Sequence, residues 1–193
     1  RRRSAGRSVR RLVDPGRSSD VSKRRAFGLI AHEVSHQWFG NLVSPAGWSE
    51  IWLNEAFATW MERKAADQLH PEWQAGLQLR RRLEDVLDRD ATDATRPIRG
   101  GPVSEANVFE VFDNVTYRKG GAVLSMLEQW LGPQTFQRGL QGYMAERRMQ
   151  PATAGDLWHH MGRAAGQPVR AVAASWTDQP GLPLVRVQAA CEA

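Results

Sequence analysis

Three neighbouring side chains in this sequence have the types and spacing of a metal-dependent hydrolytic site. The stretch LIAHEVSHQWFGN, residues 29–41, places His32 and His36 four positions apart, with Glu33 directly after the first histidine. Residues four apart project from one face of a helix, so both imidazoles can offer a nitrogen to one ion. Glu33 is placed so that its carboxylate can reach a metal-bound water rather than the metal itself.

A third metal ligand is needed, because a catalytic zinc ion takes three protein ligands and leaves its fourth position to water. Cys191 is the only cysteine, which excludes a thiolate cluster and leaves carboxylate or imidazole as the ligand type. Glu55 is the candidate, since it follows His36 by nineteen positions. That distance is enough to end one helix, turn, and bring a second helix alongside.

These residues also have plainer interpretations. A histidine pair on a helix can be a core or surface pair without a metal, and Glu55 by itself would be read as an ordinary acid on a helix surface. A lone tyrosine such as Tyr117 is more often a half-buried core residue that bonds through its hydroxyl. The metal hypothesis therefore depends on these residues occurring together.

Helices are the elements that must position these groups, because apolar residues recur at helical spacing from Asp20 onward. Ser19 or Asp20 can cap the first helix, and Gly40-Asn41 can end it. Its apolar stripe consists of Ala26, Ile30, Val34 and Trp38. Further helices are expected over about 49–69, 71–90, 120–131, 135–148, 153–165 and 168–178.

The helical region is flanked by two segments of different character. Residues 1–18 form a basic arm that we expect to be solvated or disordered, and residues 19–182 form the helical domain. Within residues 183–193, Val185, Val187 and Ala189 alternate with polar residues, which predicts a strand at the start of a following β domain.

Charge and hydropathy narrow the range of partners. Residues 1–25 hold ten of the 26 Lys and Arg and two of the 21 Asp and Glu, so the rest of the chain is slightly acidic. The arm contains Ser and Gly and no aromatic residue, which disfavours nucleic-acid binding. No run of eighteen apolar residues is present, so we expect a soluble chain that does not enter a membrane. Cytoplasmic and exported locations both remain open.

Longer segments resemble the M1 family of zinc aminopeptidases, which are gluzincins with a thermolysin-like catalytic domain. The segments HEVSHQWFGNLV and WLNEAFATWME match the family's metal-binding region, with Ala56 where glycine is commoner. NVTYRKGGAVLSMLEQWLG is similar to the segment that carries the family's catalytic tyrosine and a Lys-Gly pair, here Tyr117, Lys119 and Gly120. SWTDQPGLPLVRV is similar to the stretch before the family's β-sandwich, and the resemblance covers about residues 14–187.

The resemblance implies a mainly α fold, namely the helical part of a thermolysin-like zinc metallopeptidase catalytic domain with a short C-terminal strand. It implies one zinc ion on His32, His36 and Glu55, with Glu33 and Tyr117 as catalytic residues. The reaction would be peptide hydrolysis with release of the N-terminal residue. Lys119 would be catalytic or would only shape its turn. We also expect an oxygen acceptor for the second ring nitrogen of each ligand histidine, with Glu50 as one candidate.

One family segment is not found. The M1 family binds the substrate ammonium largely through a G-x-M-E-N segment upstream of the first histidine, and the residues before His32 do not spell it. We therefore expect a fragment that binds zinc, needs missing domains of its parent protein for efficient aminopeptidase activity, and exposes an apolar face. The alternatives are a truncated remnant that only binds zinc, an endopeptidase, and a nucleic-acid-binding arm.

Overall fold

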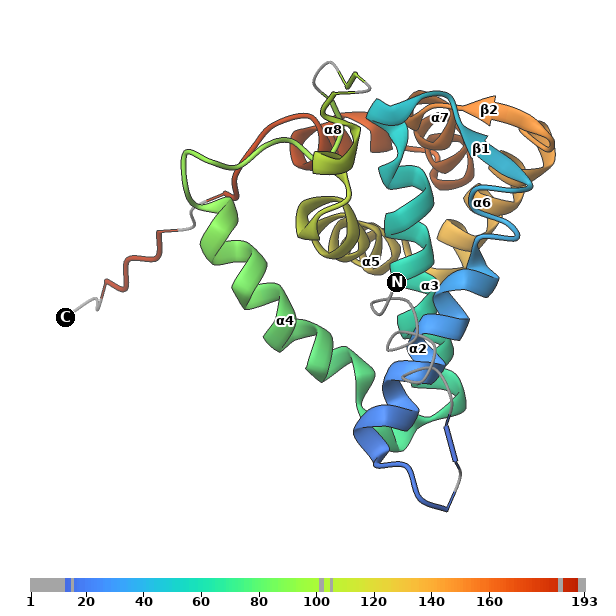
Figure 1. The fold of residues 1–193 in the computed structure, drawn as a ribbon. Coiled ribbons are helices and arrows are strands. Elements are labelled where there is room, and N and C mark those ends of the chain that lie inside the picture. Colours follow the sequence, from blue (N-terminus) through green and yellow to red (C-terminus); the bar gives the residue numbers. More distant parts are fainter. Residues whose placement is uncertain (1–12, 15, 101–102, 105, 184–185, 191–193) are drawn as a thin grey trace.

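The predicted helical fold is confirmed by a computed structural model, which describes residues 13–14, 16–100, 103–104, 106–183 and 186–190 (Figure 1). Most of the predicted basic arm, residues 1–18, lies outside the described residues. None of the helices within the described ranges has the length and apolar character to cross a membrane.

Helix α2, Asp20–Ser35, begins where the sequence predicts, because the Ser19 hydroxyl accepts a hydrogen bond from the backbone of Ser22. It ends several residues earlier than predicted. His36 is its C-terminal cap with helical backbone angles, and the chain turns back at Gly40, whose φ of 125° favours glycine.

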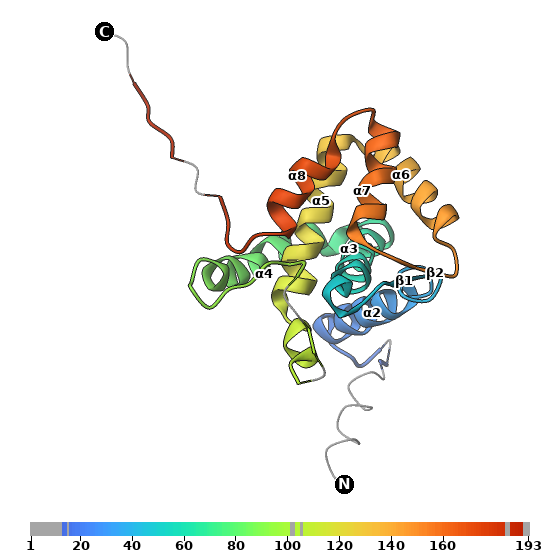
Figure 2. The same cartoon turned by 90° about the horizontal axis from the view of Figure 1, so that it is seen from above.

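Helix α3, Trp52–Leu69, is the central element of the fold (Figures 1 and 2). The short 3₁₀ helix η1, Trp48–Glu50, leads into it, and α3 packs against both α2 and α5, Gly120–Leu131. Its Trp52, Ala56 and Phe57 are completely buried. Burial on several sides fixes the position of α3 between its two neighbours.

The remaining helices surround this centre. The predicted helix 71–90 is divided into η2, Pro71–Trp73, and α4, Ala75–Asp90, because Gln74 between them has left-handed backbone angles. After the 3₁₀ helix η3, Val108–Val111, the π-helix η4, Val115–Lys119, continues directly into α5. The last three helices are α6 (Pro133–Glu146), α7 (Ala154–Ala165) and α8 (Val169–Thr177).

A small parallel sheet joins distant parts of the chain, and the sequence did not predict it. Strand β1, Val43–Pro45, pairs with β2, Gln150–Ala152. Three-residue strands are too short to show an alternating pattern. The strand predicted near the C-terminus is not formed in the described residues 186–190, which have no regular secondary structure. An alternating pattern becomes a strand only where a partner supplies hydrogen bonds, and no partner pairs with these residues in the described part of the chain.

Apart from Ala26, the predicted apolar stripe does not face the core. Ile30, Val34 and Trp38 are 61%, 50% and 49% exposed, while Ala26 and Gly28 lie on the buried side. The small residues let α2 approach α3 closely, which turns the larger apolar side chains outward. An exposed apolar face is therefore present on α2 and the turn after it.

A buried ion pair anchors the C-terminal end of η4. Lys119 Nζ lies 2.7 Å from Asp90 Oδ2 at the end of α4, and it donates a hydrogen bond of 2.9 Å to the carbonyl of Gly181. Both side chains are almost completely inaccessible. Of the two interpretations of Lys119, the structure supports the one in which it shapes the fold.

The contact between α3 and α5 should be sensitive to added volume at Gly120. A Cβ atom there would lie 2.7 Å from the Ala56 Cβ, and neither atom can rotate away. We predict that Gly120→Ala destabilises the fold by ~1–3 kcal/mol because the two helices must separate. Gly76→Ala in α4, where the nearest atom lies 3.8 Å away, is the control and should be neutral or slightly stabilising. Chemical denaturation would measure both, and equal effects would contradict the prediction.

Candidate metal centre and active site

The structure brings the three predicted metal ligands to one point. His32 lies in the last turn of α2, His36 caps that helix, and Glu55 lies in the first turn of α3. Glu55 Oε2 is 3.2 Å from His32 Nε2 and 3.7 Å from His36 Nε2. One ligand atom from each residue lies within 4.8 Å of the other two.

This donor set fits a metal ion of the zinc type. Two ligand atoms ~2.1 Å from one tetrahedral ion lie ~3.4 Å apart, which is close to the two measured nitrogen–oxygen distances. His36 Nδ1 lies 2.8 Å from Asn54 Oδ1 and 3.0 Å from the carbonyl oxygen of Phe39. Both partners are acceptors, so Nδ1 donates to them and Nε2 is the nitrogen that faces Glu55.

Oxygen atoms lie beside the second ring nitrogen of each ligand histidine, as predicted. Glu50, the candidate for this role, is not one of the residues that supply them. Glu50 accepts from Arg99 Nε at 2.8 Å and from the backbone of Ala154 at 3.2 Å, so it joins η1 to the start of α7. The carboxylate beside the second ring nitrogen of His32 is instead that of Glu62, whose Oε2 forms an ion pair with His32 Nδ1 at 3.6 Å. Glu62 follows Glu55 by seven positions, two helical turns along the same face of α3, and this spacing was a signal that could have identified it.

The two glutamates change the protonation of His32. Burial alone would lower the pKa of His32, but hydrogen bonds and negative charges from Glu55 and Glu62 outweigh it and raise the pKa to about 9. In the metal-free chain His32 therefore holds a proton at neutral pH. That proton must leave before Nε2 can bind a metal.

Glu33 and Tyr117 complete the predicted set. Glu33 is exposed on α2 and borders a shallow cavity of about 380 Å³, together with Leu29 and Ile30. The Tyr117 ring lies parallel to the His32 ring, with 5.9 Å between centroids. The pKa of Tyr117 is raised well above its usual value, mainly because the side chain is partly buried. The charge of Glu55, a hydrogen bond to Glu55 and the charge of Glu33 raise it further. Its hydroxyl therefore remains a hydrogen-bond donor.

A network that the sequence analysis missed holds η4, and with it Tyr117, in place. Asp113 Oδ1 accepts from the backbone amides of Val115 and Thr116 at 3.0 and 3.1 Å. Arg96 donates to the same oxygen at 2.6 Å and to the Thr116 hydroxyl at 2.7 Å. The first turn of η4 is thus fixed by side chains from the long connection after α4.

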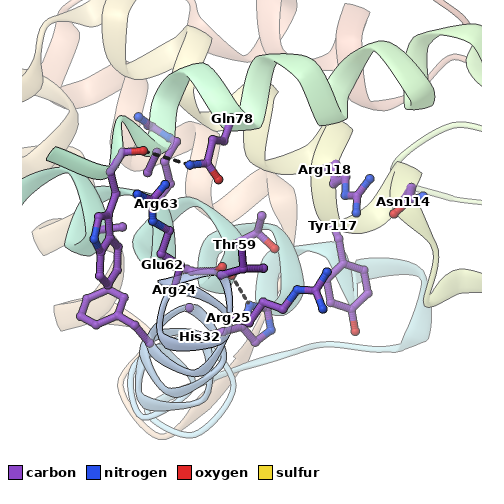
Figure 3. Close-up of a pocket in the computed structure, with 16 residues that line it drawn as sticks. Arg24, Arg25, His32, Thr59, Glu62, Arg63, Gln78, Asn114, Tyr117 and Arg118 are labelled. Carbon is purple, nitrogen blue, oxygen red and sulfur yellow. Dashed lines mark hydrogen bonds and ion pairs between the residues drawn. The ribbon is translucent and has the colours of Figure 1, made fainter. Parts of the chain in front are cut away.

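A second, larger cavity begins at the same centre. It has a volume of about 540 Å³ and runs between α2, α3, η2, α4 and η4, with His32 and Tyr117 among its lining residues (Figure 3). Of the predicted site residues, His32 and Tyr117 thus line the larger cavity and Glu33 lines the smaller one.

The fold and this site define a helical domain in which two histidines of one helix and a carboxylate of the next form a candidate metal centre beside a tyrosine. Comparison with known proteins matches residues 5–176 to the peptidase family M1 domain. The chain therefore belongs to peptidase family M1, as the sequence motifs indicated.

Curated relatives support this assignment. The chain is 39% identical to Aminopeptidase M1-A of Oryza sativa subsp. japonica over 92% of its own length and 20% of the relative's. It is 37% identical to the Glutamyl aminopeptidase of Sus scrofa, over 94% of the chain and 19% of the relative. It is 36% identical to the Leucyl aminopeptidase of Saccharolobus solfataricus, over 91% of the chain and 22% of the relative. The chain spans about a fifth of the length of these relatives.

The raised pKa of His32 predicts how stability depends on pH in the metal-free chain. The folded state holds this proton up to about pH 9, whereas the unfolded state loses it near 6.5. The stabilisation is therefore fully present below pH 6.5 and is lost as the pH rises through 9. Thermal unfolding in the presence of a chelator should show this decline, and His32→Gln should remove that component. His159→Gln, at an exposed position of α7, should keep it; identical pH profiles for the wild type and His32→Gln would contradict the prediction.

Proposed function

We propose that this chain carries the hydrolytic centre of a zinc-dependent aminopeptidase of the M1 type. The observation that supports this most is that His32, His36 and Glu55 converge within ligand distance of one another, beside Tyr117. Family membership and the aminopeptidase names of the relatives support the same reaction class.

Zinc is the metal proposed for this centre, because two imidazoles and one carboxylate with room for a water form a catalytic zinc donor set. A bound zinc ion lowers the pKa of a coordinated water toward ~7 and polarises the carbonyl that is attacked. His36 is oriented for this role by Asn54, and His32 by Glu62. The role of the protein is to hold these donors in place before the substrate arrives.

Glu33 is the proposed general base. It follows the first ligand directly on α2, and it is exposed and borders the smaller cavity. It accepts the proton of the attacking water and then delivers it to the departing amine, so one carboxylate serves both halves of the reaction.

Tyr117 is proposed to stabilise the negative oxygen of the tetrahedral intermediate. Its hydroxyl keeps its proton because burial and the neighbouring glutamates raise its pKa. A donor that is already positioned needs no rearrangement as charge develops on the substrate oxygen. The parallel stacking of its ring on His32 keeps it close to the metal ligands.

Variants of the catalytic residues separate hydrolysis from metal binding. We predict that Glu33→Gln binds one zinc ion per chain but loses hydrolysis of an alanyl-peptide substrate. Tyr117→Phe should also keep zinc, while its rate falls by a factor of ~100 to ~1,000 because one oxyanion donor is lost. Zinc titration by calorimetry and product detection by mass spectrometry measure the two properties independently.

Metal affinity itself tests the proposed ligand geometry. Asn54→Ala should weaken zinc binding by a factor of ~10 to ~100, because His36 loses the acceptor that fixes its ring. Asn41→Ala, at an exposed position near the same turn, should leave the affinity unchanged.

Two results would decide between the proposal and its alternatives. Tight zinc binding without hydrolysis of any peptide favours a chain that only binds zinc, an alternative left open because the chain spans about a fifth of its relatives' length. Equal hydrolysis of free and N-acetylated peptides favours an endopeptidase. Unchanged zinc affinity in Glu55→Ala would refute the metal centre itself.

A further inference from the structure

The larger cavity has a charge that the proposed chemistry does not use. Among the residues that the structure describes, four arginines line it and Glu62 is the only lining acid. The arginines come from three elements and are Arg24, Arg25, Arg63 and Arg118. Since Glu62 faces His32, the cavity has an excess of positive charge directly beside the metal centre (Figure 3).

Two of these guanidinium groups are available to a ligand. Arg63 is already engaged, since it donates to Asp67 at 3.2 Å and to Ser125 at 3.0 Å. Arg25 is exposed on α2 and forms no ion pair with any residue in the described part of the chain. Arg24 is half-buried, and no hydrogen bond or ion pair joins its guanidinium to another residue in the described part of the chain.

Arg24 is also held in position by aromatic residues. Its guanidinium carbon lies 5.7 Å from the centroid of the Trp73 ring. The ring of Trp73 stacks on that of His70, with 3.8 Å between the ring centroids. It packs edge to face with the ring of Phe27, with 5.3 Å between the centroids. A cation placed over a fixed aromatic face loses less conformational freedom when it binds a ligand, so this wall of the cavity is prepared for an anion.

We propose that this cavity binds a carboxylate on the part of the peptide that follows the scissile bond. Guanidinium groups recognise carboxylates through paired hydrogen bonds, and partial enclosure strengthens the attraction. The free ammonium of an aminopeptidase substrate would be repelled here, so the leaving-group side of the peptide occupies the cavity. This inference rests on the proposed peptidase function, and it names peptides with a carboxylate in the leaving group as the preferred substrates.

Peptide binding to the zinc-loaded Glu33→Gln chain tests this without cleavage. Two C-terminally amidated peptides, Ala-Glu-Ala and Ala-Ala-Glu, are each compared with the same peptide carrying Gln in place of Glu. In addition, Ala-Ala-Ala with a free C-terminal carboxylate is compared with its C-terminal amide. The first pairs report a side-chain carboxylate, and the last pair reports the C-terminal carboxylate. We expect the favoured carboxylate to bind ~5-fold more tightly than its neutral match at low salt, with the difference shrinking as salt is added.

Charge variants assign the effect to the cavity. Arg24→Gln and Arg25→Gln combined should abolish the preference, whereas Arg138→Gln, at an exposed position of α6 outside the cavity, should keep it. Arg25→Glu should reverse the preference toward a Lys-containing peptide, and this gain cannot come from a folding defect. Thermal unfolding confirms that each variant is folded.

The outcomes separate this inference from the proposed function. Equal binding of acidic and neutral peptides, or a preference that survives the loss of both arginines, overturns the inference even if the chain with Glu33 intact hydrolyses peptides. A preference that disappears with Arg24 and Arg25 supports the cavity assignment. If the preference disappears with Arg24 and Arg25 but the chain with Glu33 intact hydrolyses no peptide, the carboxylate-binding cavity is supported and the proposed peptidase function is refuted.

Discussion

The approach of the Glu55 carboxylate to His32 and His36 is the constraint on which the rest of the site depends. Its distances of 3.2 and 3.7 Å exist only because α3 lies directly against the end of α2. A buried carboxylate between two imidazoles needs a positive partner. In the metal-free chain the proton on His32 supplies that charge, and in the proposed function a zinc ion replaces it.

Small residues make this close approach possible. A Cβ atom on Gly28 would lie 2.5 Å from Glu62 Oε1, and one on Gly40 would lie 2.4 Å from Asn54 Oδ1. Each glycine thus leaves room for the side chain that orients one ligand histidine. On the other side of α3, Gly120 lets α5 pack equally closely against Ala56. Helix α3 is therefore packed tightly against both α2 and α5.

The surroundings of α2 differ on its two sides. Glu33 projects among exposed apolar residues, Leu29, Ile30 and Val34, whereas His32 lies on the cavity that the arginines line. The proposed base and the proposed anion-binding cavity therefore lie on different faces of α2.

The sequence by itself determined the local part of this protein. His32 and His36 share a helix face because their spacing is four, and most helices began near their predicted positions because caps and prolines act locally. Tyr117 was found through a family motif. Only the tertiary structure decided that Asn54 orients His36 while Glu50 orients neither histidine, that β1 pairs with β2, and that Ile30, Val34 and Trp38 face outward. These features depend on contacts between segments far apart in the chain, which periodicity along one segment does not report.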